Sequence, residues 1–264
     1  MKEFKDTNQW AVILGGSSGL GLATAKKLAH HGLNICIIHR NSRSQEAHIS
    51  QEFSKIEAEN IKLQSYNVDA LRANKRTDLI EDLKKQWSPK DKIKVLVHSL
   101  AKGNLKPMLA QDQTTLKNDD FALTVNAMAT SLYDWTQAIF SAQLFAEDSR
   151  IISFTSEGNT KAWPNYAAVS AAKAALEAIT RNIALEFAPV GIKANCIQAG
   201  VTDTASLRLI PGHQSLIKHS LLRNPNKRLT LPEDIANAVY LLCKDEAQWI
   251  TGTTIPVDGG EHLS

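Results

Sequence analysis

The sequence has few cysteines, no long apolar run and no block of basic residues, and each shortage excludes a class of protein. Its three cysteines among 264 residues lie inside apolar segments, without the spacing of metal ligands or of a disulfide framework: Cys36, Cys196 and Cys243. We expect buried free thiols and no metal site. No apolar run approaches the length of a membrane span, and the polar start MKEFKDTNQW is unlike a secretory signal. We therefore expect a cytoplasmic protein that does not contact a membrane.

The charge balance argues against a nucleic-acid partner. The chain has 30 Lys and Arg residues against 27 Asp and Glu residues, which leaves a formal net charge of +3. A protein that tracks a phosphate backbone needs a concentrated basic surface, and no such cluster is present. With 43% apolar residues, the chain is long enough to bury a sizeable core, so we expect one α/β domain over residues 1–264.

A glycine-rich turn near the N-terminus predicts a phosphate site. An apolar run from Trp10 ends in GGSSGLG, and a helical pattern then continues to Gly32. Glycines let the main chain approach an anion, and the N-terminus of a helix presents N–H groups to it. Gly15, Gly19 and Gly21, between a strand and a helix, therefore indicate a dinucleotide cofactor.

The second predicted strand, LNICIIHR, ends at His39 and Arg40. An NAD-binding protein usually places Asp or Glu here, where the carboxylate accepts from the ribose hydroxyls. Arg40, with Arg43 close behind, instead suits a ribose phosphate through planar, charge-assisted contacts. This favours NADPH over NADH, and the alternative is a solvated arginine that follows a strand.

Strands and helices then alternate along the chain. We predict helices near 45–59, 74–87, 114–146 and 232–243, and strands over 61–68, 93–101, 150–156, 192–200 and 253–260. This alternation is typical of a single doubly wound parallel sheet, Rossmann-type, of about seven strands with helices on both faces. Ligands of such sheets bind beyond the carboxyl ends of the strands. The polar segment 202–228 is predicted to be a substrate lid.

The segment SEGNTKAWPNYAAVSAAK holds three reactive groups, Ser156, Tyr166 and Lys173. Pro164 fits the first turn of a long helix, on which seven steps of about 100° would place Tyr166 and Lys173 on one face. A neighbouring ammonium favours phenolate character, as acid–base chemistry requires. The alternative is a half-buried tyrosine and a solvated lysine without a chemical role.

Together these features resemble the short-chain dehydrogenase/reductase family over nearly the whole chain. The matching positions are Gly15, Gly19, Gly21, Asn126, Ser156, Lys173 and the VDGG sequence at 257–260. In most of the family the catalytic Tyr stands four residues before the Lys, where this chain has Val169. The spacing of Tyr166, the HSLA sequence at 98–101 and QAGVTDT after the sixth strand look like the enoyl-acyl-carrier-protein reductase branch. Ser156 and Asn126 look closer to its NADPH-dependent subgroup.

The resemblance implies reduction of the carbon–carbon double bond of a trans-2-enoyl thioester by NADPH. Tyr166 would then stabilise the enolate, and Lys173 would hold the nicotinamide ribose. Ser156 would orient the substrate or Tyr166, or would only cap the backbone. Asn126 would bind a carbonyl or a relay water, or would only pin its helix. The cofactor contacts expected are Gly15, Ser17, Ser18, Gly19, Leu20, Gly21, Arg40, Asn67, Val68, Ser99, Ala101, Lys173, Ala199 and Thr202.

The expected substrate contacts are Lys102, Tyr166 and Leu207, and the expected carrier of the substrate is acyl carrier protein or CoA. An acidic carrier protein would dock on a basic rim, for which the candidates are Lys102, Lys106, Arg208, Lys218, Arg223, Lys227 and Arg228. An ordinary solvated surface is the alternative for these residues. The resemblance also implies a homotetramer, with a homodimer as the alternative.

The sequence is also compatible with two functions other than enoyl reduction. Within the same family, the chain could reduce a 2,4-dienoyl or a 3-ketoacyl thioester, and Asn126 is shared with ketone reductases. From a different class, it could be a catalytically silent regulator that binds NADP(H). The presence of Tyr166, Lys173 and Ser156 argues against a silent protein.

Overall fold

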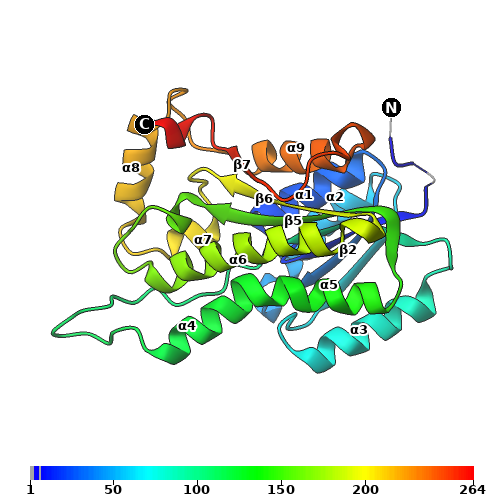
Figure 1. Cartoon of the computed structure of the whole chain (residues 1–264), viewed down its shortest axis with the longest axis horizontal. Coiled ribbons are helices and arrows are strands. Elements are labelled where there is room, and N and C mark those ends of the chain that lie inside the picture. The colour runs from blue at the N-terminus through cyan, green and yellow to red at the C-terminus, as the bar shows by residue number, and fades with distance from the viewer. Residues whose placement is uncertain (1–2, 6) are drawn as a thin grey trace.

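The computed structural model describes residues 3–5 and 7–264, which form one seven-stranded parallel sheet between two layers of helices (Figure 1). The strand order is β3-β2-β1-β4-β5-β6-β7, and every neighbouring pair is parallel. The strands are β1 (Gln9–Leu14), β2 (Asn34–His39), β3 (Leu63–Asn67), β4 (Lys92–His98), β5 (Phe145–Ser156), β6 (Ile192–Ala199) and β7 (Thr254–Val257). The predicted doubly wound, Rossmann-type sheet is confirmed.

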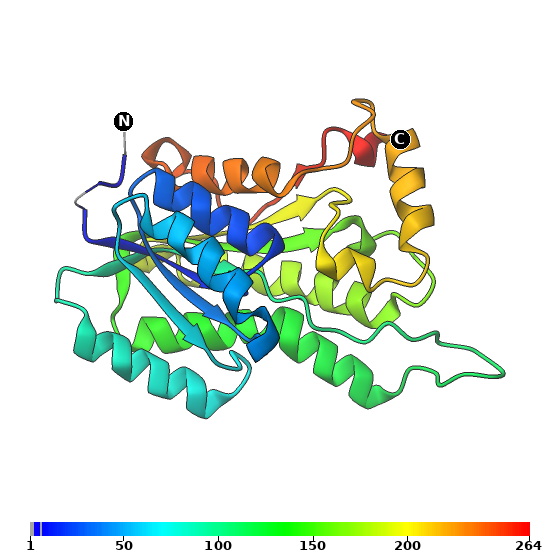
Figure 2. The same cartoon turned by 180° about the vertical axis from the view of Figure 1, so that it is seen from behind.

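The helices cover both faces of the sheet, as Figures 1 and 2 show from opposite sides. One layer consists of α1 (Gly19–His30), α2 (Glu46–Glu57) and α9 (Pro232–Cys243). The other consists of α3 (Ala73–Gln86), α4 (Asn118–Val125), α5 (Ser131–Ser141) and α6 (Ala167–Glu186). Apolar side chains of each helix layer pack against one face of the sheet and form a separate cluster there, so both faces of the sheet are buried.

Strand β1 shows why a central strand of this sheet is almost entirely apolar. Trp10, Val12 and Leu14 point into the cluster beneath α3, α5 and α6, whereas Ala11 and Ile13 point into the cluster beneath α1, α2 and α9. Because side chains alternate between the two faces of a strand, burial of both faces requires a continuous apolar run. The run WAVIL meets this requirement.

One predicted helix is shorter than expected. The structure replaces the helical region predicted over 114–146 by α4, a π-helix over Asn126–Thr130, and α5, and β5 already begins at Phe145. The left-handed conformation of Gln143 (φ 57°) stops the chain from continuing as a helix. Residues 102–117 form an extended arm that projects beyond α4 at the left of Figure 1. The outgoing and returning parts of this arm are joined by a hydrogen bond in which the N–H of Leu116 donates to the carbonyl of Pro107 at 2.9 Å.

The segment predicted as a lid contains two helices, α7 (Ala205–Arg208) and α8 (His213–Arg223). In both views α8 stands at the same end of the molecule as the last residues of the chain. Within residues 3–5 and 7–264, no helix is both long enough and apolar enough to cross a bilayer.

Candidate active site

A cavity of about 470 Å³ lies at the carboxyl ends of the central strands. Most of the residues predicted to bind cofactor or substrate line it: Gly15, Ser18, Gly19, Leu20, Ser99, Ala101, Ser156, Tyr166, Lys173, Ala199, Thr202 and Leu207. The other predicted residues do not reach its wall: Ser17, Gly21, Arg40, Asn67, Val68, Lys102 and Asn126. The structure therefore gathers Ser156, Tyr166 and Lys173 in one place. It leaves Arg40, Asn67 and Val68, the contacts predicted for the adenine end of the cofactor, outside the cavity.

The turn after β1 has the shape of a phosphate cradle. Gly15 adopts φ +85°, and a Cβ on it would lie 2.5 Å from the carbonyl oxygen of Ser99, so no other residue fits without a shift. Helix α1 begins four residues later, and its first turn contains no acidic residue. Its unpaired N–H groups therefore face the cavity without a competing negative charge. This cradle fits the diphosphate of a dinucleotide.

The residues at the predicted adenine end form a separate network. The guanidinium of Arg40 donates to Asp69 at 2.8 Å, and the side chain of Arg40 is 63% exposed. Asn41 connects the two neighbouring segments: its Oδ1 accepts from Ser17 Oγ at 2.8 Å, and its N–H donates to Asn67 Oδ1 at 3.0 Å. Sequence reasoning missed Asn41 and Asp69, although both directly follow strand ends that carry predicted contacts.

The prediction that Tyr166 lies on the helix was wrong. Helix α6 begins at Ala167, Pro164 lies in the preceding turn, and Tyr166 is the residue just before the helix, with φ −109° and ψ 0°. Asn165 has a left-handed conformation (φ 62°), which a continuous helix cannot contain. The carbonyl of Tyr166 still accepts from the N–H of Ser170 at 2.8 Å. The start of α6 therefore fixes the backbone of Tyr166, which lines the same cavity as Lys173.

The hydroxyl of Tyr166 lies in a buried environment beside Ser156. Burial raises the pKa of Tyr166, and the nearby Ser156 side chain opposes the shift. Ser156 Oγ itself is buried and has no hydrogen-bond partner of normal geometry among the described residues. A buried hydroxyl without a partner costs free energy, so this oxygen is available to a ligand in the cavity. Tyr166 keeps its proton near neutral pH and can donate it in a hydrogen bond.

Lys173 is buried on α6, and its ammonium donates to the carbonyl oxygen of Phe154 at 2.6 Å. Burial lowers the pKa of Lys173 to about 8. The nearby Cys196 and Glu177 act in the opposite direction, and the Glu177 carboxylate accepts from Thr155 Oγ1 at 2.7 Å. The ammonium is thus a positive charge that strand β5 holds at the inner wall of the cavity.

Two further residues from the matching sequence positions, His98 and Asn126, make contacts within the protein instead of facing the centre of the cavity. His98 lines the cavity, but it is buried, its Nε2 is 2.8 Å from Ser131 Oγ, and burial lowers its pKa to about 3. It is therefore a neutral structural residue. Asn126 is the first residue of the π-helix, and its Oδ1 accepts from Thr130 Oγ1 at 3.2 Å. Single-turn π-helices occur frequently at functional sites.

A family model decides the classification. The model described as "Enoyl-(Acyl carrier protein) reductase" matches residues 15–262. The chain belongs to this family of short-chain dehydrogenase/reductases. It is therefore an oxidoreductase that uses a nicotinamide cofactor, and the cradle at Gly15 fits the diphosphate of such a cofactor.

The curated relatives of this short-chain dehydrogenase/reductase have varied activities. An acetoacetyl-CoA reductase of Allochromatium vinosum is 25% identical over 254 residues, which cover 95% of this chain and 97% of the relative. A tropinone reductase homologue of Arabidopsis thaliana is 28% identical over 252 residues, which cover 95% of this chain and 78% of the relative. Sequence similarity thus establishes the reductase family and leaves the substrate open.

Two solved structures share the fold. The enoyl-[acyl-carrier-protein] reductase (NADH) of Aquifex aeolicus has a TM-score of 0.83 and 22% identity, with 97% of each chain covered. The enoyl-(acyl-carrier-protein) reductase of Anaplasma phagocytophilum, solved in complex with NAD, has a TM-score of 0.81 and 20% identity, with 99% of this chain and 94% of that chain covered. At these identities the likeness shows the fold alone.

The basic rim predicted for this short-chain dehydrogenase/reductase is largely neutralised by ion pairs. Its paired members are Lys106 with Asp120, Arg208 with Asp203, Arg223 with Glu157, and Arg228 with Asp234. A paired cation contributes little field to a distant partner. Sequence reasoning missed all four partners. Only the pair of Arg223 with Glu157 joins distant segments; the other partners lie 5 to 14 positions along the chain.

Proposed function

We propose that this protein reduces the carbon–carbon double bond of a trans-2-enoyl thioester with NADPH, as in fatty acid elongation. The observation that carries the proposal is the position of the tyrosine. Val169, four residues before Lys173, is 5% exposed and packs in an apolar cluster with Ala127, Met128 and Ala172. It has no proton to donate, so Tyr166 is the phenol available to the substrate, one turn away from the place where a ketone reductase needs it.

The displaced hydroxyl suits the geometry of an enoyl thioester. When bound, the nicotinamide of NADPH would supply a hydride to the β-carbon of the enoyl thioester. Negative charge would then develop on the thioester oxygen until a proton from solvent reaches the α-carbon. Tyr166, protonated because burial raises its pKa, donates a hydrogen bond to that oxygen. The bond strengthens as charge develops, so it stabilises the transition state more than the bound substrate. The buried Ser156 hydroxyl beside it can donate to the same oxygen or orient Tyr166.

The remaining predicted residues hold the reactants. The cradle at Gly15 and the start of α1 would bind the diphosphate, and Lys173 would donate to the nicotinamide ribose from its place beside Phe154. Arg40 supports the choice of NADPH, because its exposed guanidinium could exchange Asp69 for a ribose phosphate.

The lid segment supplies an apolar wall to the cavity. Its lining side chains include Leu207, Leu209, Ile210 and Leu216. Such a wall suits the acyl chain of a thioester, and the carrier we propose is acyl carrier protein or CoA. We also propose that the enzyme works in the cytoplasm, which its three free, buried cysteines support.

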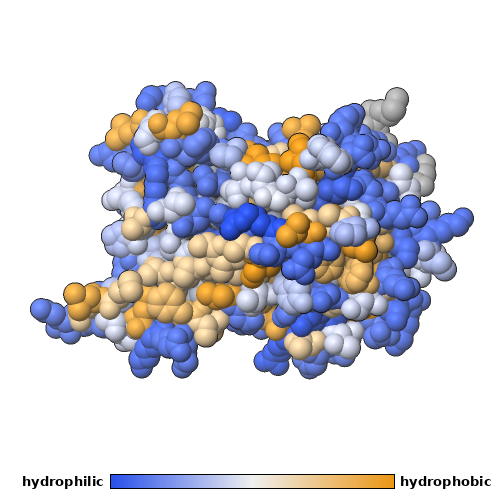
Figure 3. All heavy atoms as spheres, viewed as in Figure 1, coloured by the Kyte–Doolittle hydropathy of each residue, from blue (hydrophilic) through white to orange (hydrophobic). Residues whose placement is uncertain are grey.

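We also propose self-association as a homotetramer or homodimer. Figure 3 shows apolar side chains gathered over the arm and the neighbouring helices α4 and α6. On the arm, Met108 and Leu109 are 70% and 89% exposed. Large exposed apolar areas commonly mark contact surfaces, and light scattering during gel filtration would measure the assembly.

The test of the activity is NADPH oxidation with crotonyl, 2,4-dienoyl and acetoacetyl thioesters in parallel. We expect turnover of the crotonyl substrate and its loss in Tyr166→Phe. NADPH binding, followed by cofactor fluorescence, should remain in that variant. NADPH binding without turnover of any thioester by the unmodified protein would instead support a cofactor-binding regulator.

Reduction of a 3-ketoacyl thioester is the second candidate, and the acetoacetyl-CoA reductase among the relatives favours it. Turnover of acetoacetyl thioester with no activity on crotonyl thioester would establish it. From its position before α6, Tyr166 would then have to donate to the oxygen of the ketone that accepts the hydride.

A further inference from the structure

Arg223, the last residue of α8, connects three segments at the outer wall of the cavity. One of its terminal nitrogens donates to both carboxylate oxygens of Glu157 at 2.9 Å and to the carbonyl of Glu261 at 2.7 Å. Its Nε donates to the main-chain oxygen of Ser264 at 3.0 Å. The side chains of Arg223 and Glu157 are only 16% and 19% exposed. Their ion pair is therefore partly shielded from solvent and stronger than a surface pair.

Glu157 directly follows Ser156 and begins the 3-10 turn Glu157–Asn159. The next residue, Gly158, lies against the ring of Tyr166, since a Cβ on Gly158 would be 2.4 Å from Tyr166 Cε1 and 3.4 Å from Ser156 Oγ. A shift of this short turn would therefore move the surface on which the phenol ring rests. The carboxylate of Glu157 connects this turn to α8, and the side chain of Asn159 connects it to Glu177 on α6.

We propose that Arg223 and Glu157 are a positioning pair through which the lid helix fixes the Tyr166 ring. Arg223 anchors the Glu157 carboxylate, the anchored turn holds Gly158 in place, and Gly158 sets the position of the phenol. Neither side chain needs to touch the reacting atoms. The kinetic part of this inference rests on the proposed enoyl reduction, whereas the structural part does not.

A second cation on the same carboxylate provides a matched control. Lys161 donates to Glu157 Oε1 at 2.9 Å, but it is 49% exposed and lies only four residues along the chain from Glu157. It connects Glu157 to its own loop and not to the lid. Removal of Lys161 takes a positive charge from Glu157, as removal of Arg223 does, but it leaves the connection to α8 in place. If that connection holds the turn, removal of Lys161 should have little effect on the exchange rate of the turn.

The experiment compares Arg223→Met, Glu157→Gln, their double variant and Lys161→Met. Hydrogen–deuterium exchange of the whole protein is measured over residues 157–166 and 213–223. We expect faster exchange over 157–166 in Arg223→Met and Glu157→Gln, and unchanged exchange in Lys161→Met. Faster exchange confined to 213–223 in Arg223→Met would overturn the proposal, because the pair would then stabilise only the lid.

Kinetics give the second readout. A misplaced catalytic group costs about 10- to 100-fold in rate. We expect kcat to fall by that factor in each single variant, with the Kd of NADPH unchanged, and to fall no further in the double variant. Additive losses would contradict the pair. If the unmodified protein reduces no thioester, the proposed function fails, and the exchange measurement still decides whether the lid controls the Tyr166 turn.

Discussion

The ring of Tyr166 rests on the main chain of Gly158, with no space for even a methyl group between them. A Cβ added to Gly158 would lie 2.4 Å from Cε1 and 3.0 Å from Cδ1 of the ring. Gly158→Ala should therefore displace the phenol and lower kcat for the thioester by about 10- to 100-fold. Steady-state kinetics with saturating NADPH would measure the loss.

The control for this prediction is the double variant Gly158→Ala/Tyr166→Phe. If the alanine acts only through the phenol, the double variant should be no less active than Tyr166→Phe alone. A further loss in the double variant would mean that Gly158 has another role, such as space for the substrate itself.

The parallel sheet could be predicted from the sequence because its strands can be recognised from local sequence patterns. WAVIL must be buried on both faces, and the glycine turn after it has a local conformational cause at Gly15. The location of the reactive groups could also be predicted, because the carboxyl ends of parallel strands lie at the same edge of the sheet, where ligands bind. Ser156 at the end of β5 and Lys173 on α6 accordingly line one cavity.

The errors and omissions arose where tertiary contacts or single residues decide the conformation. Tyr166 lies outside α6 because Asn165 turns left-handed, and a Pro-Asn turn competes with a helix start at Pro164. The pairing of Arg223 with Glu157 joins residues 66 positions apart, which no local pattern reveals. The basic rim looked stronger in the sequence than in the structure because of this pair and of three pairs between residues 5 to 14 positions apart, which depend on the local chain conformation.

Arg40 tests the choice of cofactor. Because its guanidinium is the charged group at the end of β2, Arg40→Gln should lower kcat/KM with NADPH by about 10-fold or more and leave kcat/KM with NADH nearly unchanged. Asp69→Asn removes the carboxylate that holds Arg40 at 2.8 Å, so it should raise the preference for NADPH. Equal losses with both cofactors in Arg40→Gln would show that this residue does not read the ribose phosphate.

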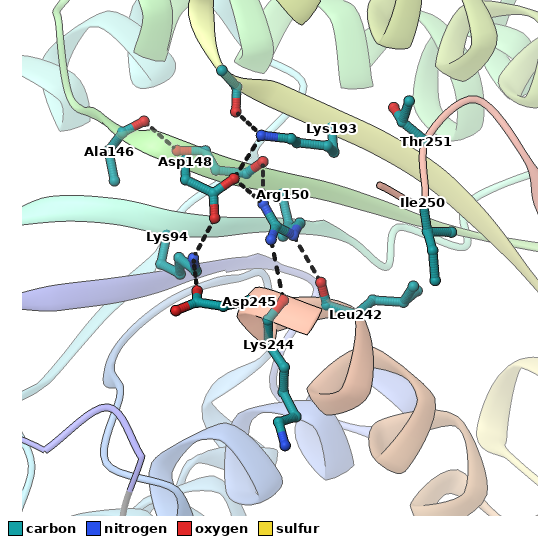
Figure 4. Close-up of polar contacts among 12 residues, drawn as sticks. Lys94, Ala146, Asp148, Arg150, Lys193, Leu242, Lys244, Asp245, Ile250 and Thr251 are labelled. Atoms are coloured by element: carbon teal, nitrogen blue, oxygen red, sulfur yellow. Dashed lines mark hydrogen bonds and ion pairs between the residues drawn. The ribbon is translucent and has the colours of Figure 1, made fainter. Parts of the chain in front are cut away.

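A cluster of charged side chains lies at the end of the strands that is far from the cavity. Figure 4 shows Asp148 among Lys94, Arg150 and Lys193, whose nitrogens donate to its carboxylate at 2.8, 2.5 and 2.7 Å. Arg150 is fully buried and also donates to the carbonyls of Leu242 and Lys244. The pKa of Asp148 lies well below its usual range: burial alone would raise it, and the hydrogen bonds from Arg150, Lys193 and Lys94 lower it.

Asp148→Asn should lower the free energy of unfolding by about 2–4 kcal/mol at neutral pH, because it leaves Arg150 with an uncompensated buried charge. The range allows for solvent screening, since the Asp148 side chain is 36% exposed. Asp245 offers the matched control: it is 3.6 Å from Lys94 but 91% exposed, so Asp245→Asn should cost about 0–1 kcal/mol. Urea unfolding of the unmodified protein and the two variants would measure both values. Equal losses of stability in the two variants would show that burial of Arg150 does not make its pairing with Asp148 more important.

The lowered pKa of Lys173 predicts two opposite trends with pH. Its folded value is about 8, against 10.5 for an ordinary lysine, because burial disfavours the ammonium. The folded state therefore binds fewer protons than the unfolded state between these values, and stability rises with pH wherever the unfolded state binds more protons. In the protein without cofactor, the contribution of Lys173 to stability should increase from about pH 8 to about pH 10.5. This increase should be absent in Lys173→Met.

Activity should move in the other direction over the same window. If the proposed role of Lys173 is correct, the ribose is held and the developing charge is stabilised by the ammonium form, which is lost above about pH 8. The value of kcat/KM for the thioester should therefore fall above that pH, while the contribution of Lys173 to stability increases. An activity profile that stays level to pH 10 would mean that bound cofactor restores the pKa of Lys173, or that catalysis does not need its charge. The apparent pKa of NADPH binding, measured over the same range, would distinguish these two explanations.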